Sequence, residues 1–249
     1  MVGALSDPFE GIHMGVTAEN VAAERGIDRA TQDAFALESQ RRATAAIAEG
    51  RFKDQIAPIE VRVKRDMVPF DTDEHPKAGA TAEGLAGLRA VFKKDGSVTA
   101  GNASGINDGA AAIVLATATA AERAGLKPKA RLLGYAHAGV RPEVMGIGPI
   151  PAVTTLLEKI DLGADAFDVI ESNEAFAAQA CAVNQALGLD TAKVNPNGGA
   201  IALGHPIGAT GAIITIKALY ELERIGGRYG LVTMCIGGGQ GIALAIERL

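Results

Sequence analysis

The second half of the chain alternates apolar runs of strand length with segments of helical pattern, and this alternation limits the possible folds more than any other feature. Alternation of this kind, with nearly continuous apolar strands, predicts an α/β fold whose sheet is covered by helices on both faces. Ligands bind such sheets at the carboxyl ends of the strands, which places Asn173 and Cys235 at the functional edge. The predicted strands span 109–116, 131–140, 167–172, 230–235 and 240–248, and the predicted helices span 117–126, 151–160, 174–187 and 206–224.

The first hundred residues are polar and follow a different pattern. Asp28 is placed as the N-cap of a helix that Gly50 ends, and residues 51–100 predict short strands and loops over a surface. The apolar run 109–116 stands before the first complete alternating unit and has few partners near it in sequence. We therefore expect its sheet neighbours to be missing from this chain.

Composition argues against several classes of protein. The net charge of -5 argues against a nucleic-acid binder, which needs a basic face. No window has the length and apolarity of a membrane span, and the N-terminus lacks the pattern of a signal peptide. The two cysteines, Cys181 and Cys235, are interpreted as thiols in a reducing compartment. We expect a cytoplasmic protein that binds neither nucleic acid nor membrane.

A glycine-rich segment around His205 is the first candidate site. His205 precedes Pro206, which favours the first position of a helix, so the imidazole is placed at a helix N-terminus. The positive end of the helix dipole disfavours the imidazolium and keeps the ring neutral, available as a base or as a hydrogen-bond donor. A capping or core histidine is the alternative interpretation.

Two further candidates lie at strand ends. Cys235 runs into Gly237, Gly238 and Gly239, a turn that can converge backbone N–H groups into an anion-binding nest and lower the pKa of a neighbouring thiol. A buried cysteine before a hairpin explains the same pattern. Asn173 can aim its amide into a cleft to position a water or an oxyanion, or it can simply cap the following helix.

The rest of the sequence gives weaker signals. Cys181 lies between alanines in a predicted helix and is interpreted as core packing. The Gly/Ser/Asn loop at 99–111 is typical of a segment close to a ligand, although turn chemistry alone explains it. The four histidines are scattered, without carboxylates or thiols at ligand spacing, so no metal site is predicted.

Taken together, these segments resemble the thiolase family, and most closely its short-chain biosynthetic type, the acetyl-CoA acetyltransferases and β-ketothiolases. The resemblance covers essentially the whole chain in order and implies a layered αβαβα fold. The matching pieces are GIHMGVTAEN (11–20), GNASGINDGAA (101–111), NEAF (173–176), GHPIGATG (204–211) and CIGGG (235–239).

The resemblance also implies roles for individual residues. His205 would activate the acyl-carrying cysteine and help to bind a thioester oxygen, and Cys235 would move the proton on the acyl α-carbon. Asn173 would hold a water in one oxyanion hole, and the Gly237 N–H would form half of a second one. The coenzyme A thioester would be the substrate, with no separate cofactor. Residues expected to contact coenzyme A are His13, Met14, Ser104, Met145 and Phe176.

The resemblance divides the chain into three parts: a loop region covering coenzyme A (1–103), the last strand and helix of an N-terminal half-domain (104–127) and a complete C-terminal half-domain (128–249). Neither cysteine matches the family's nucleophile, so we expect the N-terminal half or a second chain to supply it. We also expect a homo-oligomer. The expected activity is Claisen condensation of two acetyl-CoA or the reverse thiolysis. The alternatives are a non-catalytic module that binds coenzyme A or a partner chain, and a Cys–His hydrolase using Cys235 and His205.

Overall fold

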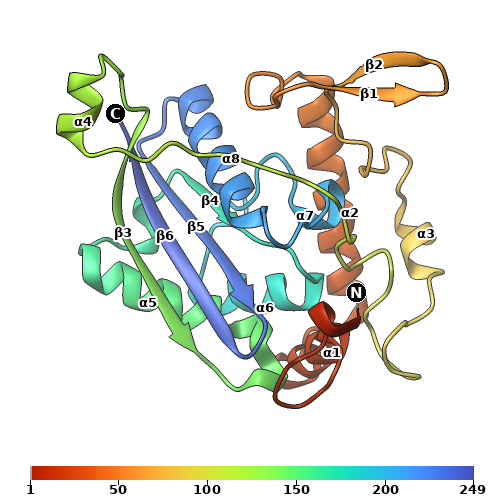
Figure 1. Ribbon diagram of the computed structural model, residues 1–249. Coiled ribbons are helices and arrows are strands. Elements are labelled where there is room, and N and C mark those ends of the chain that lie inside the picture. The colour runs from red at the N-terminus through yellow and green to blue at the C-terminus, as the bar shows by residue number, and fades with distance from the viewer. Residues whose placement is uncertain (1) are drawn as a thin grey trace.

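The computed structural model describes residues 2–249, and its C-terminal part is built on one four-stranded sheet. The strands lie in the order β3-β6-β5-β4; β6 runs antiparallel to both of its neighbours, and β4 runs parallel to β5. Figure 1 shows β5 and β6 side by side within this sheet. The strands are β3 (Ala130–Gly139), β4 (Val169–Ser172), β5 (Tyr229–Ile236) and β6 (Gln240–Arg248).

Helices cover both faces of this sheet, as the sequence predicts. On one face α5 (Pro149–Ile160) packs into a core that contains Leu231, and on the other face α8 (Thr210–Ile225) packs into a core that contains Val232. Consecutive residues of a strand point to opposite faces. A strand buried on both sides is therefore apolar along most of its length, which explains the apolar runs at the end of the chain.

The first part of the chain packs against this layer through helices. The helices α1 (Met14–Arg25) and α2 (Arg29–Ala48) both contact α6 (Ala177–Leu187). The Asp28 side chain accepts a hydrogen bond from the Thr31 N–H at 2.8 Å, which confirms the predicted N-cap. These contacts bring the N-terminal residues next to the edge of the sheet where β4 and β5 end (Figure 1).

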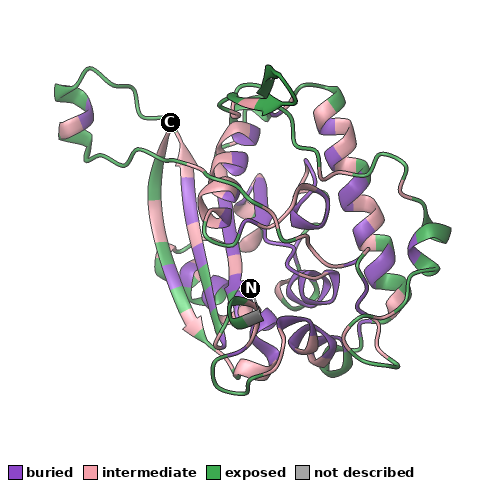
Figure 2. Ribbon diagram, turned by 45° about the vertical axis from the view of Figure 1, so that its right-hand side comes forward, coloured by how far each residue is buried: buried purple, intermediate pink, exposed green. Residues whose placement is uncertain are grey.

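Residues 51–100 form short elements at the surface. The hairpin of β1 (Ile59–Val63) and β2 (Asp66–Phe70) projects beyond α2, and its residues are largely exposed (Figure 2).

The remaining short elements of the structure are the helices α3 (Ala82–Ala86), α4 (Ala118–Arg123) and α7 (Ala200–Leu203) and the 3-10 turns η1 (Val2–Leu5), η2 (Pro142–Ile147) and η3 (Ala164–Ala166). None of the helices in residues 2–249 combines the length and apolarity that crossing a bilayer requires.

The predicted strand at 109–116 does not form. This segment is irregular in the structure, and Val114 and Leu115 are 86% and 82% exposed. A strand needs a neighbour to take up its backbone hydrogen bonds, and none of the described strands pairs with this run. Figure 2 shows the segment and α4 extending away from the body as an exposed excursion.

The helix predicted at 206–224 also begins later than expected. Residues 206–209 form a separate turn, in which the N–H groups of Ala209 and Thr210 both donate to the Pro206 carbonyl. The first residue of α8 is Thr210. His205 therefore precedes a turn rather than the helix itself, and its side chain meets α8 at Thr210.

Candidate active site

Asn173 and His205, two of the predicted site residues, lie side by side. The Asn173 Nδ2 atom is 3.4 Å from His205 Nε2. Asn173 directly follows β4 and is 2% exposed, while His205 follows α7 and the sharp bend at Gly204. The structure therefore brings together two residues that are far apart in sequence, at the edge of the sheet where the sequence placed them.

The backbone of Asn173 is held from both sides. Its N–H donates to the Thr233 carbonyl of β5 at 2.9 Å, and its own carbonyl accepts from Gln179 Nε2 at 3.2 Å. Thr233 lies two residues before Cys235, so Asn173 joins the end of β5 to the His205 loop. The Asn173 Oδ1 atom is buried and has no hydrogen-bond partner within residues 2–249. A buried acceptor of this kind requires a donor, and a bound water or substrate group would supply it.

The ring of His205 is fixed by its loop. Its Nδ1 atom lies 2.7 Å from Thr210 Oγ1, and its backbone N–H donates to Asn107 Oδ1 at 3.2 Å. Gly204 has a φ of +98°, and any Cβ there would overlap the Asn107 side chain, so this close approach requires glycine. Burial lowers the pKa of His205, so the ring is neutral at neutral pH, as predicted, although the cause is burial rather than a helix dipole.

Cys235 lies in a small apolar cluster. Its buried neighbours in the cluster are Met14, Met145 and Ala175, with Phe176 packed against them. Burial raises the pKa of the Cys235 thiol to about 12. The expectation that the glycine turn lowers this pKa is therefore wrong, because the thiol faces apolar side chains and loses the solvation that a thiolate needs. At neutral pH Cys235 is a neutral thiol.

One backbone N–H group of the glycine turn after β5 already has a hydrogen-bond partner within the chain. The Gly238 N–H donates to Asp7 Oδ2 at 3.2 Å, and Gly238 and Gly239 have φ values of +83° and +81°. Gly237 is exposed, and a Cβ built on it would lie 3.8 Å from Met14 Sδ. The Gly237 N–H thus borders the same cluster as Cys235, whereas the Gly238 N–H is taken by a carboxylate.

The residues expected to contact coenzyme A gather around this cluster. Met14 and Met145 belong to it, and Phe176 packs against it. The Ser104 N–H donates to the carbonyl of Ala175, next to Phe176, at 3.0 Å. His13 caps α1 directly before Met14 by accepting from the Gly15 N–H at 3.0 Å. Three of the predicted contacts therefore belong to the cluster of Cys235 or pack against it, and the other two are attached to its members Met14 and Ala175 through the backbone.

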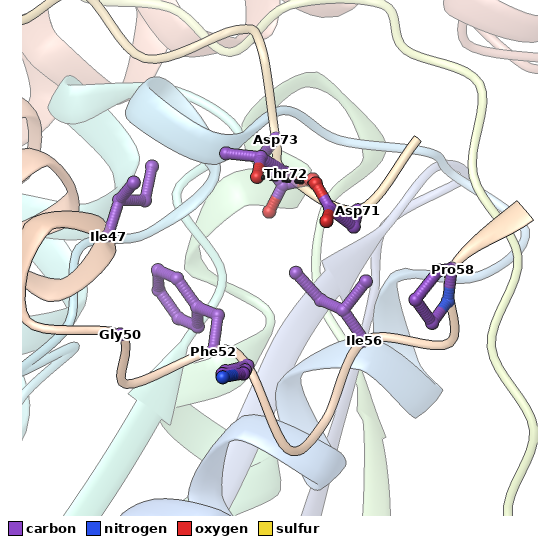
Figure 3. Close-up of a pocket in the computed structure, with 9 residues that line it drawn as sticks. Ile47, Gly50, Phe52, Ile56, Pro58, Asp71, Thr72 and Asp73 are labelled. Carbon is purple, nitrogen blue, oxygen red and sulfur yellow. Dashed lines mark hydrogen bonds between the residues drawn. The ribbon is translucent and has the colours of Figure 1, made fainter. Parts of the chain in front are cut away.

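Two hollows lie in the surface of residues 2–249, one next to His205 and one away from the predicted site residues. An open one of about 400 Å³ lies between residues 107–111 and Pro206–Ala209, next to His205. Another of about 370 Å³ lies under the hairpin and is lined by Phe52, Ile56, Asp73 and their neighbours (Figure 3). This second hollow shares no residue with the predicted site. No group of three or more metal-binding side chains occurs in the described part of the chain.

Comparison with known proteins decides the family. Residues 126–248 match the family described as "Thiolase, C-terminal domain", and residues 1–119 match "Thiolase, N-terminal domain". The chain belongs to the thiolase family. Its thiolase relatives include beta-ketothiolase BktB of Cupriavidus necator, which is 64% identical over 100% of this chain, and an acetyl-CoA acetyltransferase of Allochromatium vinosum, which is 56% identical over 100% of it.

Solved thiolase structures share the fold. The acetyl-CoA acetyltransferase of Bacillus anthracis superimposes with a TM-score of 0.96 at 53% identity over 98% of this chain. Human mitochondrial 3-ketoacyl-CoA thiolase in complex with CoA gives 0.92 at 44% identity over 99%. The chain spans 64% of the length of the two curated relatives and 62% of each of these structures.

The structure of this thiolase chain adds an aromatic residue that sequence reasoning missed. Phe92 stacks on His13 with ring centroids 4.8 Å apart, and it meets Phe176 edge-on at 6.2 Å. It therefore joins two of the residues expected to contact coenzyme A. Phe92 lies in a polar loop without periodicity, and being a lone aromatic residue there was its only signal in the sequence.

A buried carboxylate next to Asn173 was also missed. Glu174 accepts hydrogen bonds from Ser39 Oγ at 2.6 Å, Asn195 Nδ2 at 2.8 Å and the Ile201 N–H at 3.2 Å. It thereby ties α2 and α7 to the turn that carries Asn173. Burial raises the pKa of Glu174. A glutamate at the start of a predicted helix gave no sign of burial, because only the tertiary structure brings its partners together.

Proposed function

We propose that this chain supplies the proton-transfer and oxyanion-binding groups of a thiolase-type acyltransferase acting on acyl-CoA thioesters. The observation that carries the proposal is the Asn173–His205 pair, with its unpartnered buried oxygen, beside a cluster that contains a neutral cysteine thiol. The acyl-carrying nucleophile would come from outside these 249 residues, because Cys181 and Cys235 are both buried, with pKa values raised to about 12.

The chemistry assigns a task to each group. In thiolysis, the carbon–carbon bond of a 3-ketoacyl-CoA breaks after attack by the nucleophile, and the released acetyl-CoA enolate needs a proton. Cys235 would donate that proton as a neutral thiol, and its thiolate would remove it again in the condensation direction. His205 would accept the proton of the nucleophile on Nε2. This new N–H, together with a water held by Asn173, would then stabilise the enolate oxygen.

Coenzyme A would lie across the first part of the chain. This proposal is supported by Met14 and Met145, which lie in the cluster with Cys235, by Phe176, which packs against that cluster, and by Phe92, which contacts His13 and Phe176. The solved complex of human mitochondrial 3-ketoacyl-CoA thiolase with CoA supports the assignment by likeness. We propose no cofactor beyond the thioester substrate. A cytoplasmic homo-oligomer remains a prediction. The division of the chain also remains a prediction, with residues 1–103 covering the ligand, 104–127 completing an N-terminal half-domain and 128–249 forming the C-terminal half-domain.

The second candidate is a non-catalytic thiolase-fold module that binds coenzyme A or a partner chain. The burial of both cysteines favours it for the chain by itself. It would use the same surface around Met14 and Phe176, without transfer of an acyl group.

A chimera separates the two functions. The part of the Cupriavidus necator beta-ketothiolase that this chain does not cover would be joined to residues 1–249 and assayed for acetoacetyl-CoA thiolysis. We expect turnover by the chimera, none by the chain alone, and a loss of about 10²-fold or more in kcat for His205→Ala, because general base catalysis contributes at least that much. Circular dichroism would show that the variant is folded. An inactive but folded chimera, or an active His205→Ala variant, would contradict the proposal.

A further inference from the structure

We infer that Thr210 sets the tautomer of His205: its hydroxyl oxygen accepts the Nδ1 proton of the ring and leaves Nε2 unprotonated toward Asn173. Thr210 is thus a positioning residue, which acts through His205 and rests on the function proposed above. The inference depends on hydrogen-bond donors and acceptors around one hydroxyl group. It explains why a hydroxyl group, and not only a side chain of this shape, stands at position 210.

The hydroxyl group of Thr210 has two polar neighbours and one proton. Its Oγ1 atom is 2.9 Å from the Pro206 carbonyl oxygen and 2.7 Å from His205 Nδ1. A carbonyl oxygen only accepts hydrogen bonds, so the hydroxyl proton must point to Pro206 for that contact to be favourable. The hydroxyl oxygen is then left to accept, and His205 Nδ1 must carry the proton.

The far side of the ring agrees with this assignment. Asn173 presents Nδ2, which only donates, at 3.4 Å from His205 Nε2. A donor at this position favours an unprotonated nitrogen, as the Thr210 contact requires. In neutral imidazole one nitrogen donates and the other accepts. The contact on α8 specifies this tautomer, and the contact after β4 is compatible with it.

The hydroxyl is held rigidly enough to impose this choice. Thr210 is 2% exposed, so water does not compete for its oxygen. Its backbone N–H also donates to the Pro206 carbonyl at 2.9 Å, which fixes the residue at the first position of α8. The backbone of His205 is fixed in turn by Asn107. Both ends of the Nδ1–Oγ1 contact are thus anchored before any substrate binds.

The test reads the ring nitrogens directly. Long-range ¹⁵N–¹H spectra of the chain, recorded at about pH 8 where histidine is neutral and assigned with His205→Ala, separate a protonated from an unprotonated nitrogen by chemical shift. We expect Nδ1 of His205 to be protonated and Nε2 unprotonated in the wild type and in Thr210→Ser. In Thr210→Val, which keeps the shape but removes the hydroxyl, both shifts should move toward the averaged values of exchanging tautomers.

A matched control exists on the same helix. The Thr215 hydroxyl donates to the Gly211 carbonyl at 2.7 Å, as Thr210 does to Pro206, and it forms no hydrogen bond to a histidine within residues 2–249. Thr215→Val should leave the His205 shifts unchanged. A protonated Nε2 in the wild type, or unchanged shifts in Thr210→Val, would overturn the inference. The wild-type spectrum decides even if Thr210→Val does not fold.

Failure of this inference is distinguishable from failure of the proposed function. In the active chimera we expect Thr210→Val to lower kcat by about 10²-fold, which is the lower end of what a general base contributes. We expect little change in KM, because Thr210 lies outside the cluster of Met14 and Phe176. Thr210→Ser should restore kcat. Full activity of Thr210→Val would contradict the inference alone, whereas an inactive wild-type chimera would contradict the proposed function and leave the spectra to judge the tautomer.

Discussion

Lys217 and Glu171 form a buried ion pair behind the site, and breaking it tests the electrostatic part of the structure. The Lys217 Nζ atom lies 2.7 Å from Glu171 Oε2 and also donates to the Gly198 carbonyl at 2.7 Å. The two side chains are 5% and 1% exposed. We expect Lys217→Met to lower the free energy of unfolding at neutral pH by about 1–3 kcal/mol, because the Glu171 carboxyl and the Gly198 carbonyl lose their buried hydrogen-bond donor.

The pH dependence of that loss follows from Glu171. Burial raises the pKa of Glu171 from 4.5 to about 7, although Lys217 opposes the rise. In the wild type the folded state keeps this proton after the unfolded state has lost it. Stability therefore falls as pH rises from 4.5 to about 7, by about 3 kcal/mol at 1.4 kcal/mol per pH unit, and Glu171 adds no slope above pH 7. Without Lys217 the folded pKa rises further, so the loss continues above pH 7.

Urea unfolding at a series of pH values measures this effect. The difference in stability between wild type and Lys217→Met should grow by about 1.4 kcal/mol from pH 7 to pH 8. Replacing Glu171 by Met as well should remove the extra slope and recover most of the loss, because apolar replacement of a whole buried pair is often neutral. Lys129→Met, which breaks the half-exposed pair with Glu223, should cost no more than about 1 kcal/mol. A difference that does not change between pH 7 and 8 would refute the reasoning.

Two further changes probe the surroundings of the site. Glu174→Gln should lower the free energy of unfolding by about 1–3 kcal/mol in urea titrations, because an amide cannot accept all three hydrogen bonds. The control Glu158→Gln, on the exposed side of α5, should cost less than about 0.5 kcal/mol. Equal losses in the two variants would contradict the role of Glu174. Phe92→Leu should raise KM for acetoacetyl-CoA in the chimera with little change in kcat, because the ring contacts His13 and Phe176 rather than Cys235. An unchanged KM would show that Phe92 does not contact the ligand.

Most of the C-terminal layer could be predicted from the sequence because β4 and most of β5 are buried on both faces. Each of β4, β5 and β6 overlaps an apolar run that the alternation singled out. The run at 109–116 has the same composition, yet it forms no strand. Composition reports the tendency of a segment to be buried, whereas a strand also needs a partner with free backbone groups.

The chemistry of the site was harder to predict than its location. The sequence placed Asn173, His205 and Cys235 at strand ends and loops, and the structure brings Asn173 to His205 and places Cys235 in the cluster with Met14, Met145 and Phe176. The pKa of Cys235 was predicted in the wrong direction, because the glycines that follow it are visible in the sequence but the methionines around it come from other elements. The start of α8 was misplaced because Pro206 opens a turn as readily as a helix.

The central claim is that this chain handles protons and oxyanions while another segment carries the acyl group. The most direct measurement is the position of the acetyl group after the chimera reacts with isotope-labelled acetyl-CoA, located by quenching and peptide mapping. The account predicts label on a cysteine of the joined segment and none on Cys181 or Cys235. Label on Cys235 would contradict it, because a residue that holds the acyl group cannot also transfer the α-proton.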